Sequence, residues 1–237
     1  MAGARHRSIA ALTGASSPRR RRIGLLGGSF NPAHGGHRRI SLFAMRALGL
    51  DEVWWLVSPG NPLKERRDMA PLAARFASAR VQARRAPIRV TAIERELGTR
   101  YTIDTLRALA RRWPKREFVW LMGSDNLAQF HLWKDWRDVA RRMPIAVIAR
   151  PGYDAAAIAS PAMVWLRRYR IPAASMRKPG KWSAPALVLL RFDPDKRSAT
   201  QLRRNDPDWA SRISTGHYRD DLTHRLIPVA PDFGEQR

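Results

Sequence analysis

The sequence contains no cysteine in its 237 residues. Disulfide bonds, cysteine-based zinc sites and thiol nucleophiles are therefore excluded, and we expect a cytoplasmic protein, because disulfides persist mainly in oxidising compartments. No apolar run approaches the roughly 20 residues that cross a bilayer, so we expect no membrane partner. The apolar stretch from Ile9 to Leu12 is too short for the core of a signal peptide.

Acidic residues are scarce, with 20 Asp and Glu against 44 Lys and Arg, and the net charge is +24. Such a charge favours nucleic acid, an acidic membrane surface or small phosphorylated substrates, without choosing among them. Residues 1–22 hold the run Arg19 to Arg22 and no acidic residue, and we interpret them as a basic, flexible N-terminal tail. A nucleic-acid-binding arm and a start site placed too early are the alternatives.

Short apolar segments alternate with amphipathic segments after this tail, and hydrophobic residues make up 44% of the chain, which is enough for a packed core. The expected strands are Ile23–Leu26, Glu52–Val57, Ile88–Ile93, Phe118–Met122, Ile145–Ala149 and Leu187–Phe192, and the expected helices are His37–Leu48, Pro71–Arg85 and Thr102–Trp113. This alternation predicts the α/β class: a Rossmann-like, doubly wound parallel sheet with helices on both faces. Ligands of such sheets bind beyond the carboxyl ends of the strands.

The glycine-rich segment Gly27 to His37, GGSFNPAHGGH, follows the first expected strand and opens the first expected helix. Glycines allow the backbone to approach a phosphate chain closely, and a helix N-terminus offers N–H groups to an anion. The segment contains neither a Walker A motif nor a GxGxxG fingerprint. His34 and His37 are three residues apart, so both rings can face one phosphate-sized site. A metal-binding pair and a purely structural pair are the alternatives.

This segment resembles the signature of the HxGH nucleotidyltransferase superfamily, and its GGSFNP opening resembles that of the nicotinate-nucleotide adenylyltransferases. Four further segments resemble that family in the same order, over roughly residues 21–205: Glu94 to Leu106 (ERE…YTIDTL), Leu121 to Trp133, Arg150 to Tyr153 (RPGY) and Arg197 to Arg203 (RSATQLR). Ile213 to Arg219 is a partial second copy of the last motif. The loop after the second strand departs from the family's pattern, and only Lys64 carries over there.

The resemblance implies a nucleotidyltransferase-type fold over residues 23–205. We expect residues 206–237 to form a helical extension and a frayed end. The resemblance implies adenylyl transfer from ATP to nicotinic acid mononucleotide, a step of NAD biosynthesis, with Mg²⁺ carried on the ATP phosphates. In-line transfer needs positioning and charge neutralisation rather than a catalytic base. The implied catalytic residues are His34, His37 and Arg203, with at least one histidine protonated. No residue is expected to bind a metal ion.

The resemblance also assigns residues to the two substrates. The implied ATP-binding residues are Gly28, Ser29, Phe30, Gly36, Gly123, Asp125 and Ser198, the first three through backbone N–H groups near the phosphates. The implied mononucleotide-binding residues are Lys64, Tyr101, Thr102, Trp133 and Arg150. Trp133 would stack on the pyridinium ring and N–H groups near Thr102 would bind the nicotinate carboxylate. The alternatives are a helix N-cap role for Asp125 and a core position for Trp133, with Trp136 beside it.

Three other functions remain open at this stage. A nicotinamide-mononucleotide adenylyltransferase differs in one substrate group, and a phosphopantetheine adenylyltransferase shares the superfamily but lacks the pairing of the Glu94–Leu106 and Leu121–Trp133 segments. A nucleic-acid-binding protein on the same fold would use the basic charge. We expect nucleic acid to bind weakly at most, through the basic tail. The sequence does not indicate the oligomeric state.

Overall fold

The computed structural model describes residues 20–60, 69–149, 154–178, 182–192, 198–213 and 217–228. Its centre is a six-stranded parallel sheet in the order β3-β2-β1-β4-β5-β6. The strands are β1 (Arg21–Gly28), β2 (Glu52–Val57), β3 (Ile88–Thr91), β4 (Arg116–Gly123), β5 (Ile145–Ile148) and β6 (Leu187–Leu190). The order reverses between β1 and β4, which is the switch point beside which doubly wound folds bind nucleotides. The predicted fold class is confirmed.

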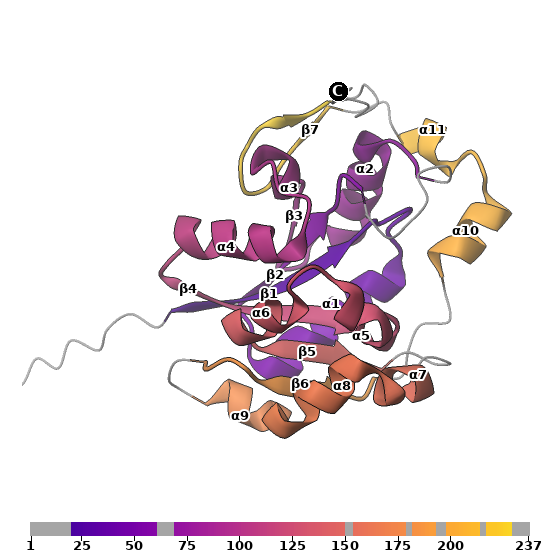
Figure 1. Ribbon diagram of the computed structural model, residues 1–237. Coiled ribbons are helices and arrows are strands. Elements are labelled where there is room, and N and C mark those ends of the chain that lie inside the picture. Colours follow the sequence, from indigo (N-terminus) through magenta and orange to yellow (C-terminus); the bar gives the residue numbers. More distant parts are fainter. Residues whose placement is uncertain are drawn as a thin grey trace, which may run out of the picture.

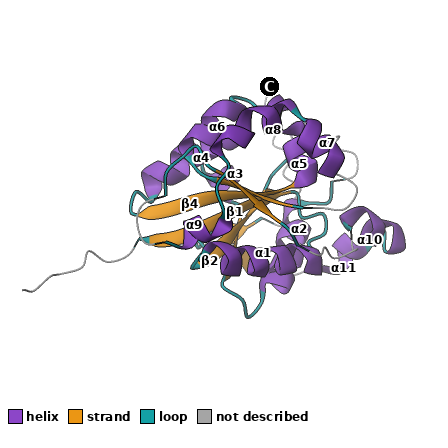
Figure 2. Cartoon of the chain, turned by 90° about the horizontal axis from the view of Figure 1, so that it is seen from below, coloured by secondary structure: helices purple, strands orange, loops and turns teal. Residues whose placement is uncertain are grey.

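Helices cover both faces of this sheet (Figures 1 and 2). One face carries α1 (Gly35–Leu48), α2 (Leu72–Ala83) and α9 (Ala173–Arg177). The other carries α3 (Ile93–Glu96), α4 (Thr102–Arg112), α5 (Ser124–Gln129), α6 (Trp136–Arg142), α7 (Asp154–Ala159) and α8 (Pro161–Leu166), with short 3-10 turns at Phe130–Leu132 and Arg167–Tyr169. In the described part of the chain, no helix is long and apolar enough to cross a membrane.

Alternate side chains of each central strand pack into two separate hydrophobic cores, one on each face of the sheet. Trp54 and Leu56 of β2 pack with α3, α4 and α6, whereas Trp55 and Val57 pack with α1 and α2. Both tryptophans are fully buried. A strand buried on both faces is apolar at every position rather than at alternate ones. This is why the run EVWWLV predicted β2 with its observed bounds.

Most elements begin or end one or two residues from the expected bounds, and three of these differences involve specific contacts or caps. β1 begins at Arg21, so the tail cannot extend to residue 22: Arg22 is buried and donates from Nε to Glu117 at 3.2 Å. Pro71 is the N-cap of α2 rather than its first residue. Ile93 belongs to α3 rather than β3, because the Thr91 hydroxyl accepts the Ile93 N–H and turns the chain out of the strand.

The chain after β6 contains two helices, α10 (Ala199–Asn205) and α11 (Trp209–Ile213), and a hairpin that the sequence did not predict. The two helices lie at the side of α2 in Figure 1. Residues 217–228, called the C-terminal hairpin below, contain the antiparallel strands β7 (Tyr218–Arg219) and β8 (Leu226–Ile227). Strands of two residues carry too little periodicity to be recognised in a sequence.

A buried carboxylate stabilises the amino-terminal edge of the sheet. Glu52 is 4% exposed and accepts hydrogen bonds from Arg89 Nε at 2.8 Å, Trp54 Nε1 at 2.9 Å and Arg116 Nη1 at 3.2 Å. Burial raises the pKa of Glu52, but the hydrogen bonds from Arg89 and Trp54 and the nearby positive charges outweigh burial and hold the pKa below its usual range. The folded protein therefore binds a proton at Glu52 less readily than the unfolded chain does.

We expect acid to destabilise the protein through Glu52. A lowered folded-state pKa contributes stability above the unfolded value of 4.5, and this stability is lost as the pH falls below it. Glu52→Gln should therefore cost about 1–3 kcal/mol at pH 7 and flatten the pH dependence below pH 5. Urea unfolding at pH 7 and pH 4 measures both effects. Asp138→Asn, which removes the exposed ion pair with Arg141, is the control; the same acid sensitivity in Glu52→Gln and wild type would contradict the prediction.

Candidate functional site

A cleft of about 510 Å³ opens at the carboxyl ends of β1 and β4, where the strand order reverses. Every predicted site residue in the described part of the chain lines it: Gly28, Ser29, Phe30, His34, Gly36, His37, Tyr101, Thr102, Gly123, Asp125, Trp133, Ser198 and Arg203. Lys64, Arg150 and the RPGY turn lie outside the described residues. Segments separated by more than 160 residues thus converge on one volume of the size of a small-molecule site.

The two histidines are arranged by the start of α1. His34 is the N-cap, and its Nδ1 accepts the Gly36 N–H at 3.1 Å, while His37 Nδ1 accepts the His34 N–H at 3.2 Å. Their ring centroids are 4.1 Å apart. An imidazole nitrogen that accepts a hydrogen bond carries no proton, so the Nδ1 atoms of both rings act as acceptors in this arrangement. The expected imidazolium would have to give up its Nδ1 bond.

The loop between β1 and α1 is held from behind by α2. Arg75 is 1% exposed and donates from Nη1 to Ser29 O at 2.8 Å and to Ser58 O at 2.6 Å. In a trans peptide the C=O and the following N–H point in opposite directions. The bond from Arg75 to Ser29 O therefore turns the Phe30 N–H away from α2. This orientation is consistent with the predicted contact between loop N–H groups and phosphates, which stays a prediction.

Phe30 adopts a backbone conformation that is rare for a bulky residue, with a φ of 48°. Its ring is buried, stacks on Trp55 at 5.1 Å and contacts the His37 ring at 4.9 Å. These contacts stabilise a strained turn, which is a common feature of ligand sites. The ring contact with Phe30 thus helps to fix the position of the His37 ring.

The last motif reaches the first one through α10. Arg203 Nη1 donates to Asn31 O at 2.6 Å, and Ser198, Ala199 and Thr200 line the cleft at the start of this helix. Ser198 is the N-cap of α10 and accepts the Gln201 N–H at 3.1 Å. This hydrogen bond therefore joins the last motif to the first and holds Arg203 beside the loop that carries His34 and His37.

Gly123 and Asp125 form the cleft wall at the end of β4. A Cβ on Gly123 would collide with Asp125 Oδ1, so glycine at 123 allows the carboxylate to fold back over the backbone. The alternative N-cap role of Asp125 is wrong, because the N-cap of α5 is Gly123 and Asp125 lies in the first turn. Gly27 has a related packing reason: a Cβ there would lie 2.7 Å from the Trp120 ring, which also lines the cleft.

Aromatic and basic side chains form the opposite half of the cleft. Trp133 lines the cleft and makes edge contacts with Phe130 at 5.3 Å and with Trp120 at 6.1 Å, so it is both a core residue and a wall residue. Trp136 packs against Phe130 and is not part of the wall. Tyr101 and Thr102 begin α4, whose N-terminal N–H groups favour an anion.

Three charged residues of this half were missed at the sequence level. Lys134 lies 4.6 Å from the Tyr101 ring centroid, and Arg100 lies beside the same ring. Glu94 of α3 accepts a hydrogen bond from the Thr105 hydroxyl at 3.4 Å. Burial raises the pKa of Glu94 to about 7, against the opposing hydrogen bonds from Thr105 and Ser58. All three lie within or directly beside the motifs that resemble the family, and this position is the only feature of the sequence that could have indicated them.

Comparison with known proteins gives one consistent result. The cytidylyltransferase-like family model matches residues 25–205. The chain is 70% identical over 215 residues to a probable nicotinate-nucleotide adenylyltransferase of Erythrobacter litoralis, covering 91% of this chain and 96% of the relative. It is 49% identical over 190 residues to a probable nicotinate-nucleotide adenylyltransferase of Bradyrhizobium sp., covering 80% and 99%.

A solved structure supports the fold independently. Plasmodium falciparum nicotinic acid mononucleotide adenylyltransferase complexed with NaAD superposes with a TM-score of 0.58, over 78% of this chain and 83% of that chain. The sequence identity is 15%, so this likeness concerns the fold alone. The structural neighbour therefore supports the fold, whereas the family membership rests on the family model and the sequence relatives.

Proposed function

Because this chain belongs to the cytidylyltransferase-like family and, within it, to the nicotinate-nucleotide adenylyltransferases, we propose that it transfers the adenylyl group of ATP to nicotinic acid mononucleotide. The products are nicotinic acid adenine dinucleotide and pyrophosphate. The observation that carries the proposal is the meeting of the first and last motifs in one cleft, where Arg203 is bonded to the loop that carries His34 and His37. A pure binding module would not need these phosphate-handling groups together.

The reaction requires the alignment of anions rather than a base. A phosphate oxygen of the mononucleotide attacks the α-phosphorus of ATP, and the bond from that phosphorus to the bridging oxygen breaks, so that pyrophosphate leaves with the electron pair. In this proposal each histidine donates to the ATP phosphates from its ring, and Arg203 supplies a fixed positive charge beside them. Preorganised donors of this kind stabilise the charge that develops as the bond breaks. ATP enters as its Mg²⁺ complex, so the ion is part of the substrate.

The two halves of the cleft divide the substrates between them. Gly123 and Asp125 at the end of β4 bind the adenosine, Asp125 through ribose hydroxyls, and the N-termini of α1 and α10 bind the triphosphate. Trp133 stacks on the pyridinium ring, and the N–H groups at the start of α4 bind the nicotinate carboxylate. Lys134 adds a positive charge beside Tyr101. Lys64 and Arg150 remain proposed ligands of the mononucleotide phosphate.

We expect Trp133→Ala to weaken binding of the mononucleotide selectively. A cation–π contact contributes about 1–2 kcal/mol in a partly desolvated site, so KM for the mononucleotide should rise roughly tenfold while KM for ATP stays nearly unchanged. Steady-state kinetics with each substrate varied in turn measures both constants. Trp165→Ala, which removes a half-buried tryptophan away from the cleft, is the control. Equal changes in both KM values would show that Trp133 is a packing residue only.

The function itself is tested by pyrophosphate release from ATP and Mg²⁺ with three candidate acceptors. Nicotinic acid mononucleotide should be turned over faster than its amide, and phosphopantetheine should be inert. Equal rates with acid and amide would overturn the preference for the acid. No release with any of the three would overturn the reaction while leaving the fold unaffected. Binding of an oligonucleotide that weakens steeply with salt would add a secondary role for the basic tail.

A further inference from the structure

The C-terminal hairpin lies beyond the segment that the family model matches, and none of its described residues lines the cleft. It nevertheless contacts the part of the chain that leads from β3 into the cleft wall. We propose that the hairpin positions the mononucleotide-binding half of the cleft, with Asp220 as the positioning residue. This inference rests on the proposed function, because it concerns the affinity of the same site for one of its two substrates.

Asp220 is the central bond acceptor of the hairpin. It is 2% exposed, and its Oδ2 accepts the Ala92 N–H at 2.6 Å and the Thr91 hydroxyl at 2.9 Å. Its Oδ1 accepts the N–H groups of Leu222 at 2.8 Å and Thr223 at 3.0 Å. One buried carboxylate thus ties the turn of the hairpin to the residues that connect β3 to α3. Charge-assisted bonds of this kind are about twice as strong as neutral ones.

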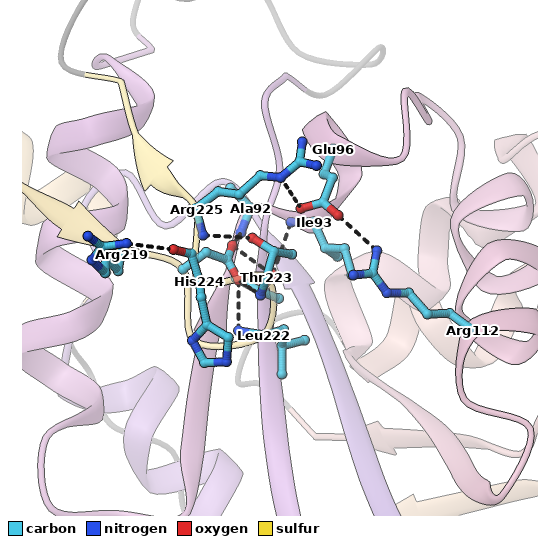
Figure 3. Close-up of polar contacts among 11 residues, drawn as sticks. Ala92, Ile93, Glu96, Arg112, Arg219, Leu222, Thr223, His224 and Arg225 are labelled. Carbon is cyan, nitrogen blue, oxygen red and sulfur yellow. Dashed lines mark hydrogen bonds and ion pairs between the residues drawn. The ribbon is translucent and has the colours of Figure 1, made fainter.

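A second set of contacts holds α3 from the side of the hairpin (Figure 3). Arg225 Nε lies 3.7 Å from Glu96 Oε2, and Arg112 Nη1 of α4 donates to Glu96 Oε1 at 2.8 Å. Glu96 therefore connects the hairpin to both α3 and α4. The pKa of Glu96 is affected first by burial, which raises it, but the hydrogen bond from Arg112 and the nearby positive charges bring it below its usual range.

The anchored segment continues directly into the substrate wall. α3 has four residues, too few for a helix that is stable by itself, so its position depends on tertiary contacts. Its Glu94 lines the cleft, and Glu94 O accepts the Thr99 N–H at 3.0 Å. The Thr99 hydroxyl lies 2.9 Å from that of Thr105 in α4. The next residues, 100 to 102, line the cleft.

The hairpin meets the ATP-binding half of the cleft through α2, where the Tyr218 ring lies 6.5 Å from the Phe76 ring. Asp221, the neighbour of Asp220, pairs with both backbone groups of Val90 and with Arg80 of α2, so it fastens the hairpin to β3 and α2 without contacting α3. Asp220 and Asp221 therefore have different structural roles. Asp221 docks the hairpin, whereas Asp220 places α3 and the wall that follows it.

The test compares Asp220→Asn with Asp221→Asn. In Asp220→Asn we expect KM for nicotinic acid mononucleotide to rise about tenfold, because a wall displaced by a fraction of an ångström loses its preorganised contacts, and KM for ATP to change less than twofold. Asp221→Asn should lower the melting temperature without changing the ratio of the two KM values. Partial unfolding alone would reduce the amount of active enzyme and leave both KM values unchanged. The proposal would be overturned if Asp220→Asn left both KM values unchanged or raised the KM values for ATP and the mononucleotide equally. It would also be overturned if Asp221→Asn raised the mononucleotide KM as selectively as Asp220→Asn does.

A second measurement separates this proposal from the proposed function. Amide hydrogen exchange of residues 92–102 should be faster in Asp220→Asn than in Asp221→Asn, whether or not the protein turns over the mononucleotide. Wild-type protein that forms no product would overturn the reaction, whereas unchanged exchange would overturn the positioning role. If Asp220→Asn does not fold, Arg225→Ala removes only the ion pair to Glu96 and should raise the mononucleotide KM about threefold. An unchanged KM in that variant would overturn the proposal.

Discussion

Replacing His37 with alanine should lower kcat by about a hundred- to a thousand-fold, the usual effect of removing one preorganised donor from a developing anion. His37 lines the cleft, and its Nδ1 accepts the His34 N–H, so the proposed donor to the developing charge is Nε2–H. This donor acts on a charge that grows as pyrophosphate leaves, so the loss falls on kcat rather than on KM for ATP. Pyrophosphate release under saturating substrates measures it.

The control experiments distinguish lost chemistry from lost structure. His37→Gln places an amide nitrogen near the Nε2 position and should recover part of the activity, whereas His37→Ala should not. His217→Ala changes an exposed histidine outside the cleft and should behave as wild type. Because His37 also accepts the N-cap backbone bond, the thermal midpoint of each variant must be compared. A kcat within a few-fold of wild type in His37→Ala would remove this histidine from the mechanism.

Replacing Arg75 with methionine should cost about 3 kcal/mol or more of stability and most of the activity. The guanidinium is buried and donates to Ala70 O at 2.8 Å as well as to the carbonyl groups of Ser29 and Ser58. Methionine fills the space but leaves these buried carbonyl groups without their donor, and each such loss costs about 1–3 kcal/mol. The loops after β1 and β2 would then separate, and the N–H groups at the phosphate site would lose their orientation.

Arg38→Met is the matched control for Arg75→Met. Arg38 Nη1 also donates to two carbonyl groups, Gln82 O at 2.9 Å and Arg84 O at 2.7 Å, but these lie at the far end of α2, away from the cleft. We expect a small loss of stability and normal kcat. Arg75→Lys should not restore the wild type, because an ammonium group lacks the planar fork that bridges two loops. Denaturant unfolding and kcat, measured for all three variants, decide whether Arg75 organises the site.

The sequence predicted the strands well where burial leaves a strong pattern. The central strands are buried on both faces, so their continuous apolar runs, such as EVWWLV, are visible without any tertiary information. The turns after them are glycine-rich, and their place at strand ends predicted where the cleft opens. Short elements were missed because they give no recognisable apolar pattern. These are α3, the C-terminal hairpin and the helices of residues 154–177.

The residues that sequence reasoning chose for the site were those in motifs, and all that the structure describes lie in one cleft. The sequence could not reveal which atoms of these residues form hydrogen bonds within the protein. His34 and His37 use Nδ1 within the protein, and Ser198 caps its own helix. Which side-chain atoms form these bonds depends on the donors and acceptors that the folded backbone places beside them.

By itself the sequence determined the fold class through its apolar periodicity, and its motifs were sufficient for a resemblance to one family, which supplied the candidate ligand-binding residues. Only the tertiary structure decided that Arg75 holds two loops, that Glu94 has a pKa of about 7, and that Asp220 anchors the wall from more than 120 residues away. Burial and long-range hydrogen bonds are properties of the packed chain. They arise between segments that have no relation in the sequence until the sheet brings them together.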